Sequence, residues 1–493
     1  MLRIIRIILA ALCFTGITLL FLDFTGATHA FLGWLAKIQL LPAILSANIV
    51  VIAALVLLTL IFGRVYCSVI CPLGVMQDII AWAGKRGKKK NRFKYSYSRP
   101  KTWLRVTMLV IMVASIVFGI SAVTALLAPY SAYGRIASSF FAPLYALVNN
   151  LFAVVAERAG SYAFYPTEVW GKATAVVVVA AVTLVALAIL AWRNGRTYCN
   201  TICPVGTVLG FLSKFSLFRP VIDTSKCTGC KLCEKSCKAA CIDISNHKID
   251  RSRCVACMDC ISTCTHGALK YKPGWAAKKA AESPATDASR RAFLTTAGAL
   301  TLAAAKARAQ DNTLVKQVAP KNNPAPKVRL TPPGSQSHKN LENKCIGCQL
   351  CVQACPGNIL VPSASLEHFM QPEMRYNENY CRPECNRCSS VCPTGAIRPI
   401  SLEEKASTQI GHAVWYHWLC VPMVEGDSCG NCARHCPTGA ITMVEDQSAE
   451  GKTVHVPAID REKCIGCGAC QSVCPTRPVS AIQVEGHEVH KVI

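Results

Sequence analysis

The sequence predicts a multi-domain protein, in which an α-helical membrane bundle of four spans is followed by α+β domains rich in cysteine. Three observations lead to this fold class. The chain has 493 residues, which is room for several domains. Its mean hydropathy is +0.32, although its formal net charge is +25. It also contains 30 cysteines, most of them at a recurrent spacing.

Four apolar runs each approach the ~20 residues that a helix needs to cross the hydrocarbon core of a bilayer. They cover residues 4–21, 41–62, 104–128 and 173–192. Lysine and arginine are frequent near the N-terminus, between 64 and 105, and just after the fourth run, whereas the connections 22–40 and 129–171 carry few. The positive-inside rule therefore places the basic segments in the cytoplasm and these two connections in the periplasm.

The basic excess suits anionic lipid rather than nucleic acid, because no stretch combines basic residues with interleaved aromatics. None of the four runs contains histidine, the usual axial ligand of haem b, and the sequence has no C-x-x-C-H motif. No haem is therefore expected.

An internal repeat follows the second and fourth runs. Each copy reads G-R-x-Y-C-x-x-x-C-P, with cysteines at Cys67 and Cys71 in the first copy and Cys199 and Cys203 in the second. The repeat predicts two related helix pairs within a membrane domain of residues 1–206. Four thiolates at one membrane face could bind a metal, hold a cluster or cycle as disulfides, and the sequence does not choose among these.

Residues 207–270 contain two cysteine runs with x2-x2-x3 spacing, the pattern that binds [4Fe–4S] clusters in bacterial-type ferredoxins. The runs are Cys227, Cys230, Cys233, Cys237 and Cys254, Cys257, Cys260, Cys264. In such two-cluster domains the fourth cysteine of each run binds the other cluster. We therefore predict that Cys264 joins the first three cysteines of the first run and Cys237 those of the second. Zinc is the alternative, but zinc sites usually pair C-x2-C units.

Residues 271–309 combine a linker with an export signal. Arg290 and Arg291 precede a weakly apolar stretch that ends in Ala-Arg-Ala at 307–309, which is the pattern of a twin-arginine signal. The signal predicts a fifth crossing that delivers the rest of the chain to the periplasm. Whether it is cleaved is left open. A second linker, 310–340, follows.

Residues 341–493 contain four more cysteine runs, and proline follows the last cysteine of each. These sixteen cysteines predict four [4Fe–4S] clusters and bring the total to about six. They are Cys345, Cys348, Cys351, Cys355; Cys381, Cys385, Cys388, Cys392; Cys420, Cys429, Cys432, Cys436; and Cys464, Cys467, Cys470, Cys474.

Together these motifs resemble a known pair of subunits. Residues 1–270 resemble the NapH-type membrane subunit, with its C-x-x-x-C-P motifs and two-cluster ferredoxin tail. Residues 285–493 resemble the NapG-type partner, with its twin-arginine signal and four clusters. The departure from this family is that both parts lie in one chain.

The resemblance implies a quinol dehydrogenase of anaerobic respiration in the bacterial inner membrane. Its two-cluster domain would be cytoplasmic, and its four-cluster domain would pass electrons to a periplasmic reductase or c-type cytochrome. It also favours nested sharing of the fourth cysteines, first run with fourth and second with third; sharing between neighbouring runs is the alternative.

Tyr133 and Arg135, in the aromatic connection 129–171, are the candidate quinol-site residues. The alternative is an interfacial belt of aromatic side chains. A second function is also open, since C-x-x-x-C-P membrane proteins with such tails resemble reducing factors for metalloenzyme assembly. Residues 23–28 faintly resemble a flavin-attachment motif, but the match is too short to predict FMN.

Overall fold

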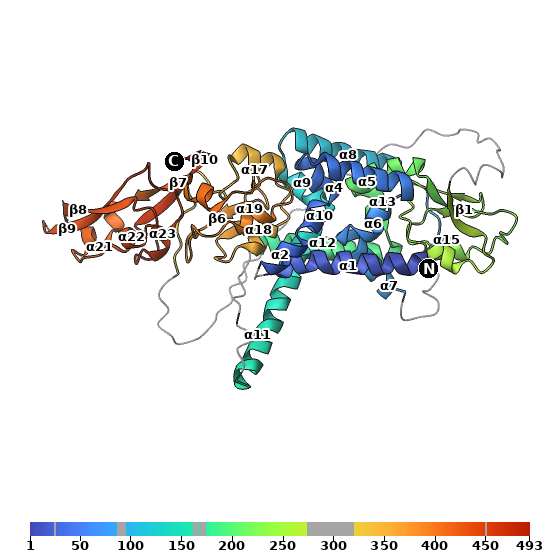
Figure 1. Cartoon of the computed structure of the whole chain (residues 1–493), viewed down its shortest axis with the longest axis horizontal. Coiled ribbons are helices and arrows are strands. Elements are labelled where there is room, and N and C mark those ends of the chain that lie inside the picture. The colour runs from blue at the N-terminus through green and yellow to red at the C-terminus, as the bar shows by residue number, and fades with distance from the viewer. Residues whose placement is uncertain (24–25, 86–94, 161–165, 167–173, 274–319, 449–450) are drawn as a thin grey trace, which may run out of the picture.

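The computed structural model describes residues 1–23, 26–85, 95–160, 166, 174–273, 320–448 and 451–493. The molecule is elongated, with a helical bundle in the middle (Figure 1). A small domain of residues 218–273, here the two-run domain, lies at one end beside the N-terminus. The domain of residues 320–493, here the four-run domain, lies at the other end and contains the C-terminus. The predicted twin-arginine segment lies outside the described residues.

Four helices of the bundle fall within or close to the four apolar runs. They are α1 (Leu2–Leu22), α5 (Ile49–Phe62), α8 (Thr102–Val117) and α12 (Thr174–Asn194). The prediction of four spans is confirmed only as helical content with candidate apolar helices. α1, α12 and the unbroken helical unit Pro129–Arg158 are long and apolar enough to cross a membrane, whereas α5 and α8 are shorter.

Two of the apolar runs are interrupted, which explains the shorter helices. In the second run, α4 (Leu40–Leu45) ends before Asn48, whose side chain accepts a hydrogen bond from Val51 N and so begins α5 anew. In the third run, α8 stops before Gly119, whose φ of 71° is left-handed, and α9 (Ser121–Leu127) follows. Hydropathy alone does not reveal such breaks.

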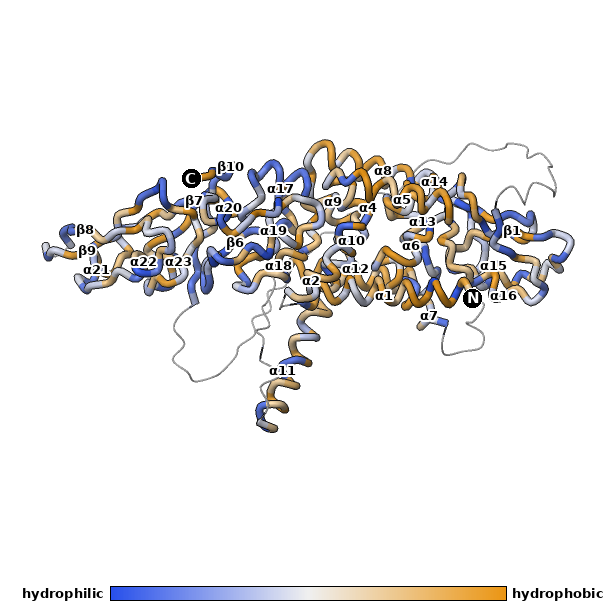
Figure 2. Tube along the Cα trace, viewed as in Figure 1, coloured by the Kyte–Doolittle hydropathy of each residue, from blue (hydrophilic) through white to orange (hydrophobic). Residues whose placement is uncertain are grey.

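Shorter helices complete the bundle. They are α2 (Ala27–Leu32), α3 (Trp34–Lys37), α6 (Val65–Val69), α7 (Pro72–Ala83), α10 (Pro129–Ile136), the π-helix η2 (Ala137–Phe141), α11 (Ala142–Arg158), α13 (Thr197–Thr201), α14 (Pro204–Leu212) and the 3₁₀ turn η3 (Ser213–Phe215). Every residue of α10 is buried. α11 projects away from the long axis and is mostly apolar (Figure 2).

The two-run domain folds around short elements: β1 (Phe218–Ile222), α15 (Leu232–Ser236), β2 (Ile242–Asp243), β3 (Lys248–Ile249), α16 (Asp259–Thr263) and β4 (Leu269–Pro273). β1 pairs antiparallel with β4, with Phe218 opposite Pro273, and β2 pairs with β3. α15 and α16 each contain the third cysteine of a run and end just before the fourth. The domain has a small apolar core of its own.

The four-run domain contains α17 (His338–Lys344), α18 (Leu350–Ala354), β5 (Leu360–Pro362), β6 (Pro372–Met374), α19 (Arg387–Val391), α20 (Leu402–Ala406), β7 (Thr408–Trp415), η5 (His417–Leu419), α21 (Val421–Val424), α22 (Asn431–Arg434), β8 (Ile441–Gln447), β9 (Thr453–Ile459), α23 (Ala469–Val473) and β10 (Ile482–Val492). Its strands pair antiparallel as β5–β6, β7–β10 and β8–β9.

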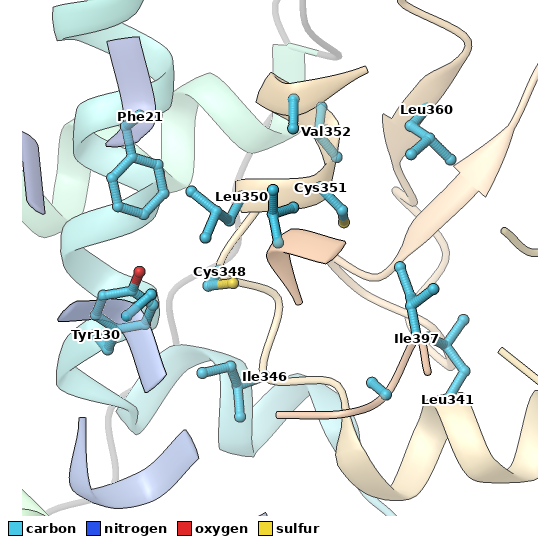
Figure 3. Packing of buried hydrophobic residues seen from close by; sticks show 14 of the residues in the cluster. Phe21, Tyr130, Leu341, Ile346, Cys348, Leu350, Cys351, Val352, Leu360 and Ile397 are labelled. Atoms are coloured by element: carbon cyan, nitrogen blue, oxygen red, sulfur yellow. The ribbon is translucent and has the colours of Figure 1, made fainter. Parts of the chain in front are cut away.

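One apolar core runs without interruption from the bundle into the four-run domain. Phe21 of α1 and Tyr130 of α10 lie beside Ile346, Cys348 and Leu350 of the first cysteine run of that domain (Figure 3). The first run is therefore held against the bundle.

Candidate functional site

The cysteines of the two-run domain lie as the crossed ligand assignment requires. One small cavity is lined by Cys227, Cys230 and Cys233 of the first run together with Cys264, the last cysteine of the second. Cys237, the last of the first run, is close enough to Cys257 and Cys260 to interact electrostatically. The crossing follows from α15 and α16, which carry the chain past one site toward the other.

The four-run domain shares its fourth cysteines between neighbouring runs. Cys392 interacts electrostatically with three cysteines of the first run, and Cys355 lines a cavity with three of the second. Cys436 lines a cavity with the first three cysteines of the fourth run. Cys474 interacts electrostatically with Cys432 of the third run. The resulting quartets are site 1 (Cys345, Cys348, Cys351, Cys392), site 2 (Cys355, Cys381, Cys385, Cys388), site 3 (Cys436, Cys464, Cys467, Cys470) and site 4 (Cys420, Cys429, Cys432, Cys474).

The preference for nested pairing is therefore wrong. α18 packs against α19, and α22 packs against α23, so each pair of neighbouring runs forms a compact unit. Between the second and third runs the chain forms α20 and strand β7, which place the two units one after the other. Site 2 adjoins site 3, because Cys381 N donates a hydrogen bond to Cys467 O at 2.9 Å.

The quartets suit a polynuclear cluster better than a single ion. Among the described residues, no three His, Cys, Asp or Glu side chains converge closely enough to hold one metal ion. The thiols instead surround cavities, as in the three quartets whose cysteines line them. A cubane spaces its four thiolates more widely than a tetrahedral zinc site does, so the donor set fits [4Fe–4S] clusters.

The four cysteines of the C-x-x-x-C-P repeat also lie together. Cys67, Cys71, Cys199 and Cys203 are each no more than 5% exposed. Cys203 interacts electrostatically with the other three, so the two copies of the repeat form one site rather than two. Gln77 Nε2 donates a hydrogen bond to Cys199 Sγ at 3.3 Å. We call these four residues the membrane quartet.

Each copy of the repeat holds the other through a buried arginine. Arg64 of the first copy donates to Cys199 O at 3.2 Å, and Arg196 of the second donates to Cys67 O at 2.6 Å. Both guanidinium groups are fully buried. A methyl group on Gly74 would lie 2.2 Å from Cys67 O, and the equivalent atom on Gly206 would lie 2.3 Å from Cys199 O. Only glycine leaves room for these crossed contacts.

A charged network joins the bundle to the two-run domain. Asp78 of α7 accepts contacts from Arg196 Nε at 2.7 Å and from Lys238 Nζ at 3.0 Å, and Lys238 also contacts Asp259 at 3.1 Å. Burial alone would raise the pKa of Asp78, but the charges of Arg196 and Lys238 outweigh it and hold that pKa well below its ordinary value. The carboxylate is therefore ionised throughout the physiological pH range.

The same network brings the membrane quartet close to the second cysteine run. Arg64, whose Nη2 lies 3.8 Å from Cys67 Sγ, also donates to Ser252 O at 3.0 Å. Ser252 lies two residues before Cys254, whose thiol interacts electrostatically with Arg64. One arginine thus contacts the membrane quartet and the start of a ferredoxin-type run.

At the other end, the four-run domain docks on α10 and η2 through small residues. Ser131 Oγ donates to Gly347 O at 3.2 Å, and Ser138 Oγ donates to Gln349 Oε1 at 2.9 Å. A methyl group on Gly134 would lie 2.3 Å from Cys348 O. This close approach puts site 1 directly against the bundle.

Tyr133 and Arg135, the predicted quinol-site residues, are fully buried in this part of the bundle. The Tyr133 hydroxyl lies 2.5 Å from Thr18 Oγ1, and its ring packs edge-on against Phe14 and Phe21. Arg135 Nη1 donates to Ser131 Oγ at 2.9 Å and to the Ala125 carbonyl. These contacts pack α10 against α1 and α9, and the role of the two residues in quinol oxidation stays a prediction.

Models of known families match the same segments. A 4Fe-4S binding domain matches residues 45–91 and 174–222, which are the two copies of the membrane repeat. A second 4Fe-4S binding domain matches 224–240, and a 4Fe-4S dicluster domain matches 344–396 and 427–477. Each dicluster match covers all or most of two neighbouring runs, in agreement with the geometry. No solved structure matches the chain.

The fold and these matches define the class: the chain is a ferredoxin-type iron–sulfur electron-transfer protein. It belongs to the family that includes the methylamine utilization ferredoxin-type protein MauM. It is 33% identical to MauM of Methylobacillus flagellatus over 160 residues, which are 31% of this chain and 68% of that protein. It is also 30% identical to the ferredoxin-type protein NapG of Escherichia coli over 158 residues, or 30% of this chain and 66% of that protein.

The ferredoxin-type protein NapF of E. coli is 25% identical over 158 residues, which are 32% of this chain and 87% of NapF. The predicted resemblance to NapG is thus confirmed. The chain spans about two thirds of the length of its MauM and NapG relatives.

Sequence reasoning missed the residues that join these sites. The repeat's shared Gly-Arg-x-Tyr flank was visible, and Arg64 and Arg196 are its arginines. The role of Asp78 could not be predicted from the sequence. A single aspartate on an apolar helix looks like an ordinary solvent-exposed residue until its cationic partners are known.

Proposed function

We propose that the chain is a membrane-bound, quinol-oxidising electron-transfer protein that serves a periplasmic reductase or c-type cytochrome. Electrons would leave quinol near the end of the bundle that carries the four-run domain and pass through [4Fe–4S] clusters at sites 1 to 4. When bound, these clusters supply one-electron carriers. The chain's residues bind them through cysteine, keep them in sequence and exclude water from site 1.

The order of the sites carries this proposal. Site 1 lies against α10, sites 1 and 2 interleave, site 2 adjoins site 3, and sites 3 and 4 share the second dicluster unit. Site 4 lies with α21 and α22 toward the end of the molecule farthest from the bundle (Figure 1). A line of carriers from an apolar bundle to an exposed tip suits transfer from a lipid-soluble donor to a soluble acceptor.

The proposed orientation follows the same axis. The two cysteine-rich domains lie at opposite ends of the bundle, and residues 274–319, which contain the twin-arginine segment, connect them. We place the two-run domain in the cytoplasm and the four-run domain in the periplasm of a bacterial inner membrane. The proposed domain limits are those expected from the sequence: 1–206, 207–270, 271–309, 310–340 and 341–493.

The membrane quartet would add a redox site between the bundle and the two-run domain. Its crossed arginines place positive charge at the quartet, with Arg64 Nη2 3.8 Å from Cys67 Sγ, and this charge suits a bound cluster of net negative charge. The matching 4Fe-4S binding domain over both copies of the repeat supports a cluster rather than a disulfide pair.

Anaerobic purification followed by addition of a menaquinol analogue tests the function. We expect quinol to bleach the visible absorption of the clusters and to give the electron paramagnetic resonance signals of reduced [4Fe–4S] centres. Iron counted on the same sample checks cluster loading. About 24 iron atoms correspond to six [4Fe–4S] clusters, and the membrane quartet would add at most one further cluster. Full loading without any response to quinol would favour the alternative, a reducing factor for metalloenzyme assembly.

A further inference from the structure

A small cavity lies where the bundle meets the four-run domain. It measures about 160 Å³, and its lining comes from both sides of the junction: Asp23, Gly26 and His29 from the segment after α1, and Ala354, Arg387 and Ser390 from α18 and α19. This is far more than the ~30 Å³ share of one water molecule and less than the ~300 Å³ of a pocket that encloses a whole ligand. It would take one polar edge of a ring whose remainder lies outside.

Two buried side chains form an acid–base dyad in this cavity. His29 Nδ1 lies 3.2 Å from Asp23 Oδ2, and the side chains are 9% and 2% exposed, respectively. Asp23 is itself fixed, because its carboxylate accepts hydrogen bonds from Gly26 N at 2.8 Å and from His29 N at 3.1 Å. An aspartate on Nδ1 holds that nitrogen protonated and leaves Nε2 as the acceptor.

The second ring nitrogen is available. His29 Nε2 is buried and has no hydrogen-bond partner among the described residues. A buried polar atom without a partner costs stability, so its retention points to a ligand that completes it. The dyad is therefore arranged to take a proton from something that enters the cavity.

The opposite wall leads directly to the cysteine sites. Ala354 and Val391 line the cavity, and they immediately precede Cys355 of site 2 and Cys392 of site 1. The Arg387 guanidinium packs closely over Gly26. A methyl group added to Gly26 would lie 3.3 Å from Arg387 Cζ. A molecule in the cavity would thus have a proton acceptor on one side and the nearest electron acceptors on the other.

The surroundings select a lipid-soluble reductant. His29 lies in α2, and α2 and the following helix α3 expose Phe31 (79%) and Trp34 (56%). They lie at the end of α1, a helix long and apolar enough to span a membrane. Large apolar side chains at such a level meet the lipid boundary and would guide an apolar tail past the cavity.

From these observations we propose that the cavity between Asp23–His29 and Arg387 is the quinol oxidation site, with His29 Nε2 as the proton acceptor. This rests on the proposed function and replaces Tyr133 and Arg135 as the expected location. Two O–H bonds of the quinol break and two C=O bonds form. The two protons leave in turn through His29 to solvent, and the two electrons reduce two oxidised [4Fe–4S] clusters of the four-run domain by one electron each.

The test uses the full-length, cluster-loaded protein. His29→Gln retains polarity and removes the proton acceptor, so we expect quinol-driven cluster reduction to slow about 100-fold or more. Reduction by dithionite and iron content should stay unchanged. His455→Gln, an exposed histidine on β9, is the matched control and should react at the wild-type rate. A wild-type rate in His29→Gln would overturn the site but leave the function intact. No quinol-driven reduction in the wild-type protein would instead reject the proposed function.

A binding measurement covers the case in which His29 variants do not fold. Wild-type protein is photolabelled with an azido-quinone and digested, and the labelled peptides are identified by mass spectrometry. We expect label on peptides that contain His29 or Arg387. Label confined to α10 would return the site to Tyr133 and Arg135. Label on Tyr97 or Phe211 would move it to the cavity of about 460 Å³ beside the two-run domain.

Discussion

The two ends of the bundle hold their iron–sulfur domains by different means. The two-run domain has its own core, adds Val255 to the core of the bundle, and is joined to the bundle mainly through buried charges centred on Asp78. The four-run domain shares the core of the bundle and docks through glycine and serine. Buried charges fix the orientation of the two-run domain, but the junction weakens when water or salt reaches them. A shared core instead makes docking of the four-run domain part of folding. The four-run domain should therefore be the harder one to detach.

This contrast also separates the carriers. At the two-run end, Arg64 lies between the membrane quartet and the second ferredoxin-type run, so electrostatics can tune the potentials there. At the four-run end, the backbone of site 1 touches α10 without an intervening charge. Four separate substitutions should therefore disturb the clusters and their junctions to decreasing degrees. In order, they remove a cluster ligand, a buried charge, a close backbone contact and a hydrogen bond.

The largest effect is expected from Cys392→Ser. With neighbouring runs paired, this change removes one ligand of site 1, so Cys345, Cys348 and Cys351 should react with iodoacetamide under native conditions. Quinol-driven reduction of the remaining clusters should slow severely, because the carrier against the bundle is lost. Alkylated cysteines are identified by mass spectrometry. Under nested pairing, Cys420, Cys429 and Cys432 would become reactive instead.

The next effect is expected from Asp78→Ala. Arg196 and Lys238 would be left as uncompensated buried charges, which costs about 3–5 kcal/mol. The urea midpoint for bleaching of the two-run clusters should fall, while that of the four-run clusters should not. Asp460→Ala, in an exposed pair with Lys463, is the control and should cost less than about 1 kcal/mol. Equal shifts in both sets of clusters would contradict a junction held by charge at one end only.

The sequence predicted the ligand runs well because ferredoxin-type loops are local. Four cysteines within eleven residues define their own turn, so the spacing alone implies Cys227 to Cys237 as one unit. The sharing of Cys392 and Cys436 was not predictable in this way, since it depends on which helices pack together. The breaks at Asn48 and Gly119 were missed because apolar composition continues through them. The Asp23–His29 pair was missed: only Asp23 lies in the flavin-like motif of residues 23–28, and the role of the pair depends on Arg387, which is distant in the chain.

A smaller effect is expected from Gly134→Val, which tests the close contact at the four-run end. Its Cβ would lie 2.3 Å from Cys348 O, so α10 and the first run must separate. Such overpacking costs about 1–3 kcal/mol. Hydrogen exchange should rise in residues around Gly347 and Gln349. Gly357→Val is the matched change at a glycine without a left-handed φ, where an added Cβ meets nothing closer than Tyr380 O at 3.4 Å, and it should leave exchange at the junction unchanged.

The smallest effect is expected from Ser138→Ala. It removes the hydrogen bond to Gln349 Oε1 and leaves that buried amide oxygen without its hydroxyl donor, at a cost of about 1 kcal/mol. The four-run domain should remain docked, because the shared core of Phe21, Tyr130 and Leu350 is untouched. Thermal bleaching of site 1 should begin only slightly earlier. If this single change released the whole domain, the junction would depend on polar contacts, and the contrast with the charged end of the bundle would disappear.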